Sequence, residues 1–192
     1  MSKRLVSLVG FFTLSAVLFV PSASSQDKEG TPPPKPEIPA EQMAKMQEYM
    51  QLTLPSPQHE HLKYFIGEWK THTKVYMAGP GSPPLESEGK STVRWVLGKR
   101  FTEEHHLGSM MGRAYEGMGL LGYDNFRAQY VGNWVSNMST QISEMRGTRD
   151  PSGKTWTLYG EMDEPGLVIG RMVRYAKRIV NDKKFIFEMY DL

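Results

Sequence analysis

From Trp69 to its last residue, the sequence alternates with a period of two, and this pattern constrains the fold more than any other feature. In the first run, the odd positions from Trp69 to Met77 hold less polar residues, and the even positions hold Lys70, His72 and Lys74. Such alternation is typical of a half-buried β-strand. Further runs predict strands at about 85–97, 100–107, 113–123, 128–138, 139–147, 154–162, 167–180 and 184–191.

Turn sequences separate most of these runs. They are Gly79-Pro80-Gly81-Ser82-Pro83-Pro84, Gly98-Lys99, Asp124-Asn125, Asp150-Pro151-Ser152-Gly153, Asp163-Glu164-Pro165-Gly166 and Asn181-Asp182. Only the junction of Met138 and Ser139 lacks an evident turn. About nine strands with no helix between them predict an all-β antiparallel meander. Closing the meander into a barrel would remove its exposed edges.

The first 25 residues have the pattern of a secretory signal peptide. Lys3 and Arg4 precede an apolar run at 5–20, and small residues follow at 21–25. The apolar run is short for a membrane-spanning helix, and no stop-transfer pattern follows it. We therefore expect an exported protein, periplasmic or extracellular, that has no membrane association after cleavage.

A linker and two short helices are predicted before the strands. Residues 26–39 are polar and rich in proline, which is typical of a disordered, solvated linker. Residues 40–56 predict an amphipathic helix, which ends at the prolines near its C-terminus. A second helix is predicted at 59–66 and ends at Gly67. The barrel domain is predicted at 57–192. The apolar face of the first helix consists of Met43, Met46 and Met50.

The charge balance excludes one class of partner. The sequence has 23 Lys and Arg against 21 Asp and Glu, and two of the basic residues are Lys3 and Arg4. Residues 26–192 therefore carry 21 of each sign. A balanced chain without blocks of Lys and Arg lacks the electrostatic footprint of a nucleic-acid-binding protein. We expect no nucleic-acid partner.

The chain has no cysteine and 13 methionines. An exported protein often uses disulfides, whereas this one must rely on its core, which a domain of about 135 residues can supply. Catalysis by a cysteine nucleophile is excluded. Methionine packs adaptably, so its abundance indicates either a soft core or an adaptable pocket.

Several motifs of the sequence resemble the domain of unknown function 1579 family. They are Pro57-x-His59-x-x-Leu62 with Gly67-x-Trp69, Val96-Leu97-Gly98-x-Arg100-Phe101, Gly117-x-Gly119-x-x-Gly122-Tyr123-Asp124-Asn125, and Phe187-Glu188-Met189-Tyr190-Asp191. The resemblance covers about 43–192. It implies a lipocalin-like (calycin) β-barrel with Trp69 across the barrel floor. The family has no established activity, so the resemblance implies no function and no cofactor.

The sequence differs from the family at its end. Relatives continue past 188–191 with a turn and a final strand, whereas this sequence stops at Leu192. In calycins a late strand often supplies an arginine that packs over the floor tryptophan, and that strand is missing here. The resemblance therefore implies either a barrel that is open beside its first strand or a gap covered by another segment or chain. A homo-oligomer through the open edge is one such arrangement.

The richest polar cluster is Glu103-Glu104-His105-His106. In a strand, Glu103 and His105 share one face and Glu104 and His106 share the other, so one pair points into the barrel. Such a pair could bind a metal or exchange protons, or it could form a solvated patch at the barrel mouth. A metal needs three or four ligands, so no metal site is predicted.

Large and small residues alternate along the central strand, where Trp134, Ser136 and Met138 share a face. This alternation suits either a filled core or a lined pocket. We expect a lined cavity with Trp95, His105, Trp134, Ser136 and Met138 in its wall. Gly117 and Gly119 indicate strand curvature or close backbone approach, because no helix follows them to form a phosphate loop.

The sequence offers no nucleophile, so no catalytic residue is assigned. We expect an exported, non-enzymatic barrel that binds a small, largely apolar molecule and uses no cofactor. Two alternatives stay open. One is a small hydrolase or isomerase that uses the Glu/His cluster near the barrel mouth. The other is an interaction module whose open barrel edge is completed by a partner strand.

Overall fold

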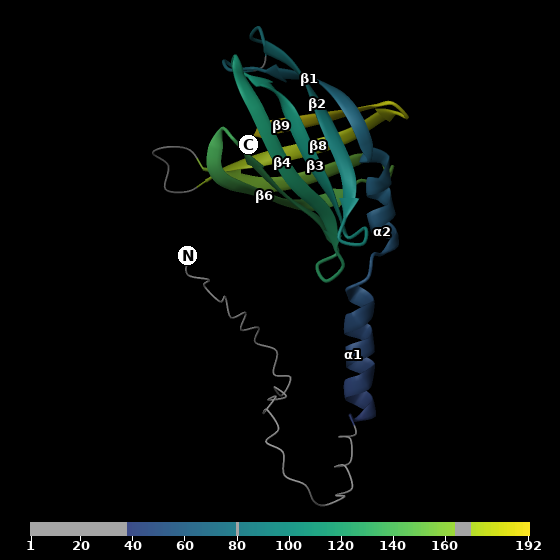
Figure 1. Ribbon diagram of the computed structural model, residues 1–192. Helices are drawn as coiled ribbons and strands as arrows, with labels where there is room; N and C mark the ends of the chain where they lie inside the picture. The colour runs from purple at the N-terminus through teal and green to yellow at the C-terminus, as the bar shows by residue number, and fades with distance from the viewer. Residues whose placement is uncertain (1–37, 80, 164–169) are drawn as a thin grey trace, which may run out of the picture. The chain divides into compact units, whose positions relative to one another are not determined.

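The computed structural model describes residues 38–79, 81–163 and 170–192. In these residues, three short helical segments precede nine strands (Figure 1). The helical segments are α1 (Ala40–Leu52), α2 (Pro57–Glu60) and the 3₁₀ helix η1 (His61–Phe65). The strands are β1 (Gly67–Val75), β2 (Leu85–Val96), β3 (Phe101–Met110), β4 (Arg113–Asp124), β5 (Gln129–Ser136), β6 (Ser139–Arg149), β7 (Thr155–Met162), β8 (Arg171–Asn181) and β9 (Lys184–Asp191).

Some predictions fall on residues outside this description. They are the signal peptide at 1–25, nearly all of the linker at 26–39, Pro80 of the first turn, most of the turn at 163–166 and the first residues of the strand at 167–180. Among the described residues, no helix has both the length and the apolar character to span a bilayer.

The nine strands form one antiparallel sheet in the order β1 to β9, each bonded to the next in the chain. This confirms the predicted all-β meander with short helices before it. The sheet curls into a half-barrel (Figure 1), as the lipocalin-like resemblance implies. Because antiparallel neighbours alternate in direction, β1 and β9 run the same way. They therefore cannot join as one more antiparallel pair, and the described residues contain no pairing between them.

The junction between β5 and β6 is a turn that the sequence did not reveal. Asn137 and Met138 form it, so β5 ends at Ser136 instead of continuing to 138. Asn137 holds the turn against β4, because its side chain accepts from the Glu116 amide at 3.1 Å and donates to the Ala114 carbonyl at 3.1 Å. The turn thus depends on a neighbouring strand as well as on its own residues.

The helix predicted at 59–66 forms as two consecutive segments, α2 and η1. Pro57 occupies the first turn of α2, where its missing N–H costs nothing. Ser56 and His59 form a capping box, in which the Ser56 amide donates to Nδ1 of His59 at 2.9 Å. This cap fixes where α2 begins.

The core lies at the closed end of the half-barrel, where η1 inserts Leu62 and Phe65. Their side chains are 0% and 1% exposed, and each such burial contributes about 1.5–3 kcal/mol. The remaining buried apolar residues are Val93, Tyr130, Trp156, Leu158, Val173 and Tyr175. We call this end the floor, and the side of the sheet that carries these residues the inner face.

Trp69 is partly buried and packs against the core at the floor. Its Nε1 donates to the Phe65 carbonyl at 2.8 Å, which ties the start of β1 to η1. Its ring meets that of Phe185 at 4.7 Å and 80°, so β9 supplies an aromatic neighbour. The Tyr64 hydroxyl also donates to the carbonyls of Asn181 and Lys184, which join β8 to β9. The two edge strands are therefore linked at the floor through η1.

Helix α1 has no buried residue, and its predicted apolar face of Met43, Met46 and Met50 is about half exposed. Contacts at its end join it to the turn after β4. The Asn125 amide donates to the carbonyls of Leu52 and Leu54 at 2.9 and 2.8 Å.

Burial of His59 predicts a loss of stability in mild acid. Desolvation, with the nearby charge of Arg100, lowers the pKa of His59 below 6.5, although hydrogen bonds with Ser56 and Tyr123 oppose this. As the pH falls through 6.5, the unfolded chain takes up a proton that the folded chain resists, so folding stability decreases. Urea titrations at pH 7.5 and 5.5 should show this decrease, and a smaller one in His59→Gln. An equal decrease in the variant would assign the effect to other groups.

Candidate functional site

An ion pair crosses the interior just above the floor. Nζ of Lys177 on β8 lies 3.2 Å from Oε2 of Glu104 on β3, and the two side chains are only 12% and 24% exposed. Strands β3 and β8 are not neighbours in the sheet, so the pair joins opposite walls of the half-barrel. The Lys177 ammonium also lies over the rings of Phe65 and Phe185, at 4.6 and 5.2 Å. These aromatic faces add cation–π attraction.

Ser91 connects this pair to His106. The Ser91 side chain is 2% exposed, and its Oγ lies 2.9 Å from Nδ1 of His106 on the adjacent strand. Burial alone would raise the pKa of Glu104. The Lys177 charge, hydrogen bonds from Ser91 and Lys177, and the charge of His106 outweigh burial and lower this pKa below 4.5. Burial lowers the pKa of His106, and Glu104 opposes that shift. At neutral pH the cluster thus contains one anion, one cation and a neutral imidazole.

The order of contacts differs from that of a hydrolytic triad. In a triad the histidine lies between the nucleophile and the carboxylate. Here Nδ1 of His106 contacts the Ser91 hydroxyl at 2.9 Å, and the Glu104 carboxylate is paired with Lys177 at 3.2 Å. The arrangement holds charge and hydrogen bonds in place and does not prepare Ser91 for attack.

Two large rings lie against glycines of the inner face. A Cβ on Gly117 would be 2.5 Å from Cζ2 and 2.9 Å from Nε1 of Trp134, and one on Gly119 would be 2.8 Å from Cε3. Likewise, a Cβ on Gly108 would be 2.9 Å from Nε2 of His106. Opposite edges of the indole thus approach β4, so the ring lies flat on the strand. At Gly119 the close backbone approach is that of the Asn133 carbonyl oxygen, which would overlap a Cβ placed there. At Gly117 the approaching group is the side chain of Trp134.

Tyr115 joins the two rings. Nε1 of Trp134 donates to the Tyr115 hydroxyl at 2.8 Å, and the rings of Tyr115 and His106 are 5.6 Å apart. A continuous line of polar and aromatic side chains therefore crosses the inner face from β2 to β5.

Away from the floor, the inner face exposes apolar side chains. Phe187 and Met189 on β9 pair across the strands with the inward-facing residues Lys177 and Tyr175, so they also lie on the inner face. Both side chains are nevertheless 53% exposed. Leu85 at the far end of β2 is 50% exposed and pairs with Val75. The half-barrel is thus packed at its floor and open above it.

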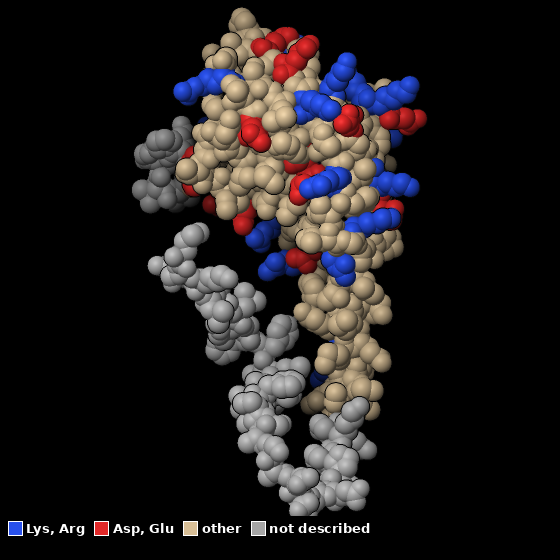
Figure 2. Space-filling model, in the orientation of Figure 1, with Lys and Arg blue, Asp and Glu red and all other residues tan. Residues whose placement is uncertain are grey.

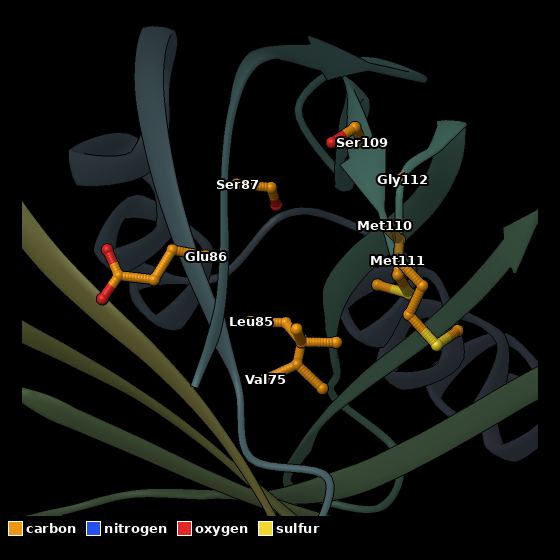
Figure 3. A pocket seen from close by; sticks show the side chains of 8 residues that line it. All are labelled: Val75, Leu85, Glu86, Ser87, Ser109, Met110, Met111 and Gly112. Carbon is orange, nitrogen blue, oxygen red and sulfur yellow. The ribbon is translucent and has the colours of Figure 1, made fainter. Parts of the chain in front are cut away.

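A hollow of about 280 Å³ lies at the end of the sheet away from the floor (Figure 3). Its lining residues come from β1, β2 and the hairpin of β3 and β4. Figure 3 shows Leu85, Val75 and the two methionines around the hollow, with Glu86 pointing away from them. The lining residues are Val75, Leu85, Glu86, Ser87, Ser109, Met110, Met111 and Gly112. The hollow is open to solvent, and much of its lining is apolar.

A second hollow of about 280 Å³ lies near the floor, beside α2, and includes His61, Tyr130 and Arg149 in its lining. Nδ1 of His61 lies 2.8 Å from the Tyr130 hydroxyl. Arg149 stacks over Trp156 at 4.8 Å and donates to the Gly153 carbonyl. These contacts hold the turn after β6 against the core.

The five residues predicted to line the cavity have different positions. Trp95, Trp134 and Ser136 lie on the inner face, and Trp95 packs against the core. Met138 lies in the turn after β5. His105 lies on the outer face, where its Nε2 is 2.9 Å from Oε1 of Glu116. Of the two predicted Glu/His pairs, the inward one is therefore Glu104 with His106.

Sequence reasoning missed Lys177, Ser91 and Tyr115. The inward direction of Lys177 could have been predicted, because alternate residues of a strand face the same side and Lys177 alternates with the buried residues Val173 and Tyr175. A lysine in an apolar alternation indicates an inward charge, but its partner lies 73 residues away. Only the curvature of the sheet brings the two together.

The outer face carries mixed charge. Figure 2 shows Lys and Arg side chains interspersed with Asp and Glu over the visible surface of the sheet. Cross-strand pairs include Lys90 with Glu68 and Arg94 with Glu103. Exposed pairs of this kind contribute about 0–1 kcal/mol each. Among the described residues, no group of three or more His, Asp or Glu side chains could hold a metal ion.

Comparison with known families places the chain in one of them. A family model described as "Protein of unknown function (DUF1579)" matches residues 54–192, which include α2, η1 and all nine strands. No curated protein matches the chain.

Proposed function

The chain belongs to the DUF1579 family of proteins of unknown function, and we propose that it is an exported, non-enzymatic protein that binds a small, largely apolar molecule on its inner face. Export is proposed from the signal-like pattern of residues 1–25. Binding is proposed from one observation. Side chains that face the concave side of the sheet, such as Phe187, Met189 and Leu85, are apolar and yet half exposed.

Apolar surface on a concave face favours a ligand more than the same surface on a convex one. A molecule seated there is covered on several sides, and each Å² of apolar area removed from water contributes about 25 cal/mol. In the described residues the outer face is the convex side of the curled sheet (Figure 1), and the floor is already filled by the core. The upper inner face is therefore the proposed site.

The length of the site favours an elongated molecule. Glu104 and Met110 lie six residues apart on β3, so the ion pair and the hollow of Figure 3 are separated by about 20 Å along the strand. Between them on the same strand, Gly108 has no side chain to occupy the inner face. A ligand of this length would place an uncharged polar group near the compensated Glu104–Lys177 pair and its apolar part towards Met110.

The proposal predicts that wild-type protein binds dodecan-1-ol, an uncharged aliphatic probe, saturably and at one site in isothermal titration calorimetry. Phe187→Glu should weaken binding about tenfold or more, because a carboxylate would enter an apolar site. Ile142→Glu is the matched control, since Ile142 is an exposed apolar residue on the outer face of β6. It should bind as wild type does. Absence of saturable binding, or equal loss in both variants, would refute the proposal.

A further inference from the structure

We infer that the molecule bound on the inner face carries a planar ring system that stacks on the free face of Trp134. This inference rests on the proposed function and names the chemical class of the ligand. The observation behind it is the flat position of the indole against β4, with Gly117 and Gly119 beneath it.

A flat ring has one face against the backbone and the other towards the interior. Most large side chains on a sheet stand away from it and fill the space above. Trp134 does not, because its ring would be 2.5 Å from a Cβ on Gly117 and 2.8 Å from one on Gly119, where the Asn133 carbonyl oxygen also lies close. Trp134 is only half-buried, although it lies on the inner face of a central strand. Its free π-face is therefore accessible from within the half-barrel.

The hydrogen-bonding group of the indole is already used. Nε1 of Trp134 donates to the Tyr115 hydroxyl at 2.8 Å, so the ring offers a ligand its π-face alone. One edge of the His106 ring, with Cε1 and Nε2, lies against Gly89 and Gly108, and the rings of His106 and Tyr115 are 5.6 Å apart. The inner face thus presents neighbouring aromatic surfaces. Offset stacking of aromatic rings adds attraction beyond the area that they bury.

The surroundings favour an uncharged ring. Glu104 lies two residues from His106 on the same face of β3, and it is neutralised by Lys177 at 3.2 Å. An ionic ligand would have to disturb that pair or remain uncompensated in a half-buried site. A neutral planar molecule needs neither change.

The test compares a planar probe with an aliphatic one in isothermal titration calorimetry. N-phenyl-1-naphthylamine is the planar, uncharged probe, and dodecan-1-ol is the aliphatic reference. Trp134→Leu should weaken binding of the planar probe about tenfold, the loss expected for one stacked pair, and should change binding of the alcohol less than about threefold. Tyr159→Leu is the matched control, because Tyr159 is an exposed aromatic residue on the outer face of β7.

Gly117→Ala provides a second variant that retains the indole. The three atoms nearest to the new methyl group all belong to the Trp134 ring, so the substitution should lift the ring off the strand and again weaken the planar probe selectively. If the alcohol binds and the planar probe does not, or if both variants weaken the two probes equally, the inference is overturned while the proposed function stands. If neither probe binds wild-type protein, both are overturned.

Discussion

Replacing Lys177 with methionine is expected to destabilise the protein by about 3 kcal/mol. The substitution leaves the Glu104 carboxylate without its counter-charge in a site where that side chain is 24% exposed. Removing one partner of a buried ion pair is costly because the other charge stays desolvated. Because Glu104 retains some contact with water, the expected loss is at the low end of the range for such pairs. Urea unfolding at pH 7.5 measures it.

The Lys177→Met loss should depend on pH with a defined sign. In the wild type, the folded pKa of Glu104 is lowered, so its stabilising contribution is present above pH 4.5 and disappears as the pH falls through the folded value. Without Lys177, burial should raise this pKa. The variant is then penalised at neutral pH, and the penalty shrinks as Glu104 becomes protonated in acid.

Two controls isolate the ion pair. The double variant Lys177→Met with Glu104→Gln should recover much of the lost stability, because no uncompensated charge remains. Arg94→Met breaks the neighbouring pair with Glu103 on the outer face, where the Arg94 side chain is 70% exposed, and should cost at most about 1 kcal/mol. Equal losses in Lys177→Met and Arg94→Met would mean that the interior pair has no special role.

The second large effect is expected at Trp156, whose replacement by alanine should cost about 3–5 kcal/mol. The side chain is completely buried, and its ring meets Phe65 at 5.0 Å and Tyr130 at 6.1 Å. The cavity left behind would lie between η1 and the sheet, so the packing of Phe65 would be lost as well. Thermal and urea unfolding should both show the change.

The matched control for Trp156→Ala is Tyr159→Ala, three residues along the same strand. Tyr159 is 47% exposed on the outer face, so its replacement should cost less than about 1 kcal/mol. Comparable losses at the two positions would contradict the placement of the core at the floor.

Much of the fold was predictable because strand alternation depends on local sequence. The alternation that begins at Trp69 identified the series of strands, and glycine and aspartate marked most of the turns between them. The turn at Asn137 was missed because it is held by contacts with β4, which no local pattern reveals. The odd number of strands in the described sheet leaves β1 and β9 running the same way, so they cannot form one more antiparallel pair.

The site was less predictable because it depends on which side of each strand faces inward. The sequence showed that Glu104 and His106 share a face, but not that this face is the inner one. The structure resolves this through the pairing of Ser91 with His106, which depends on the turn between β2 and β3. Lys177 reaches Glu104 only across the curled sheet. Trp134 and its glycines are on different strands, so their contact is equally invisible in sequence.

The most direct test of inner-face binding is NMR of the methionine methyl groups during titration with dodecan-1-ol. Met110 and Met189 lie on the inner face, whereas Met118 and Met172 lie exposed on the outer face. We predict saturable shifts of the Met110 and Met189 resonances, with those of Met118 and Met172 unchanged. Shifts of the outer pair alone, equal shifts of all four, or no shift at saturating probe would contradict binding on the inner face.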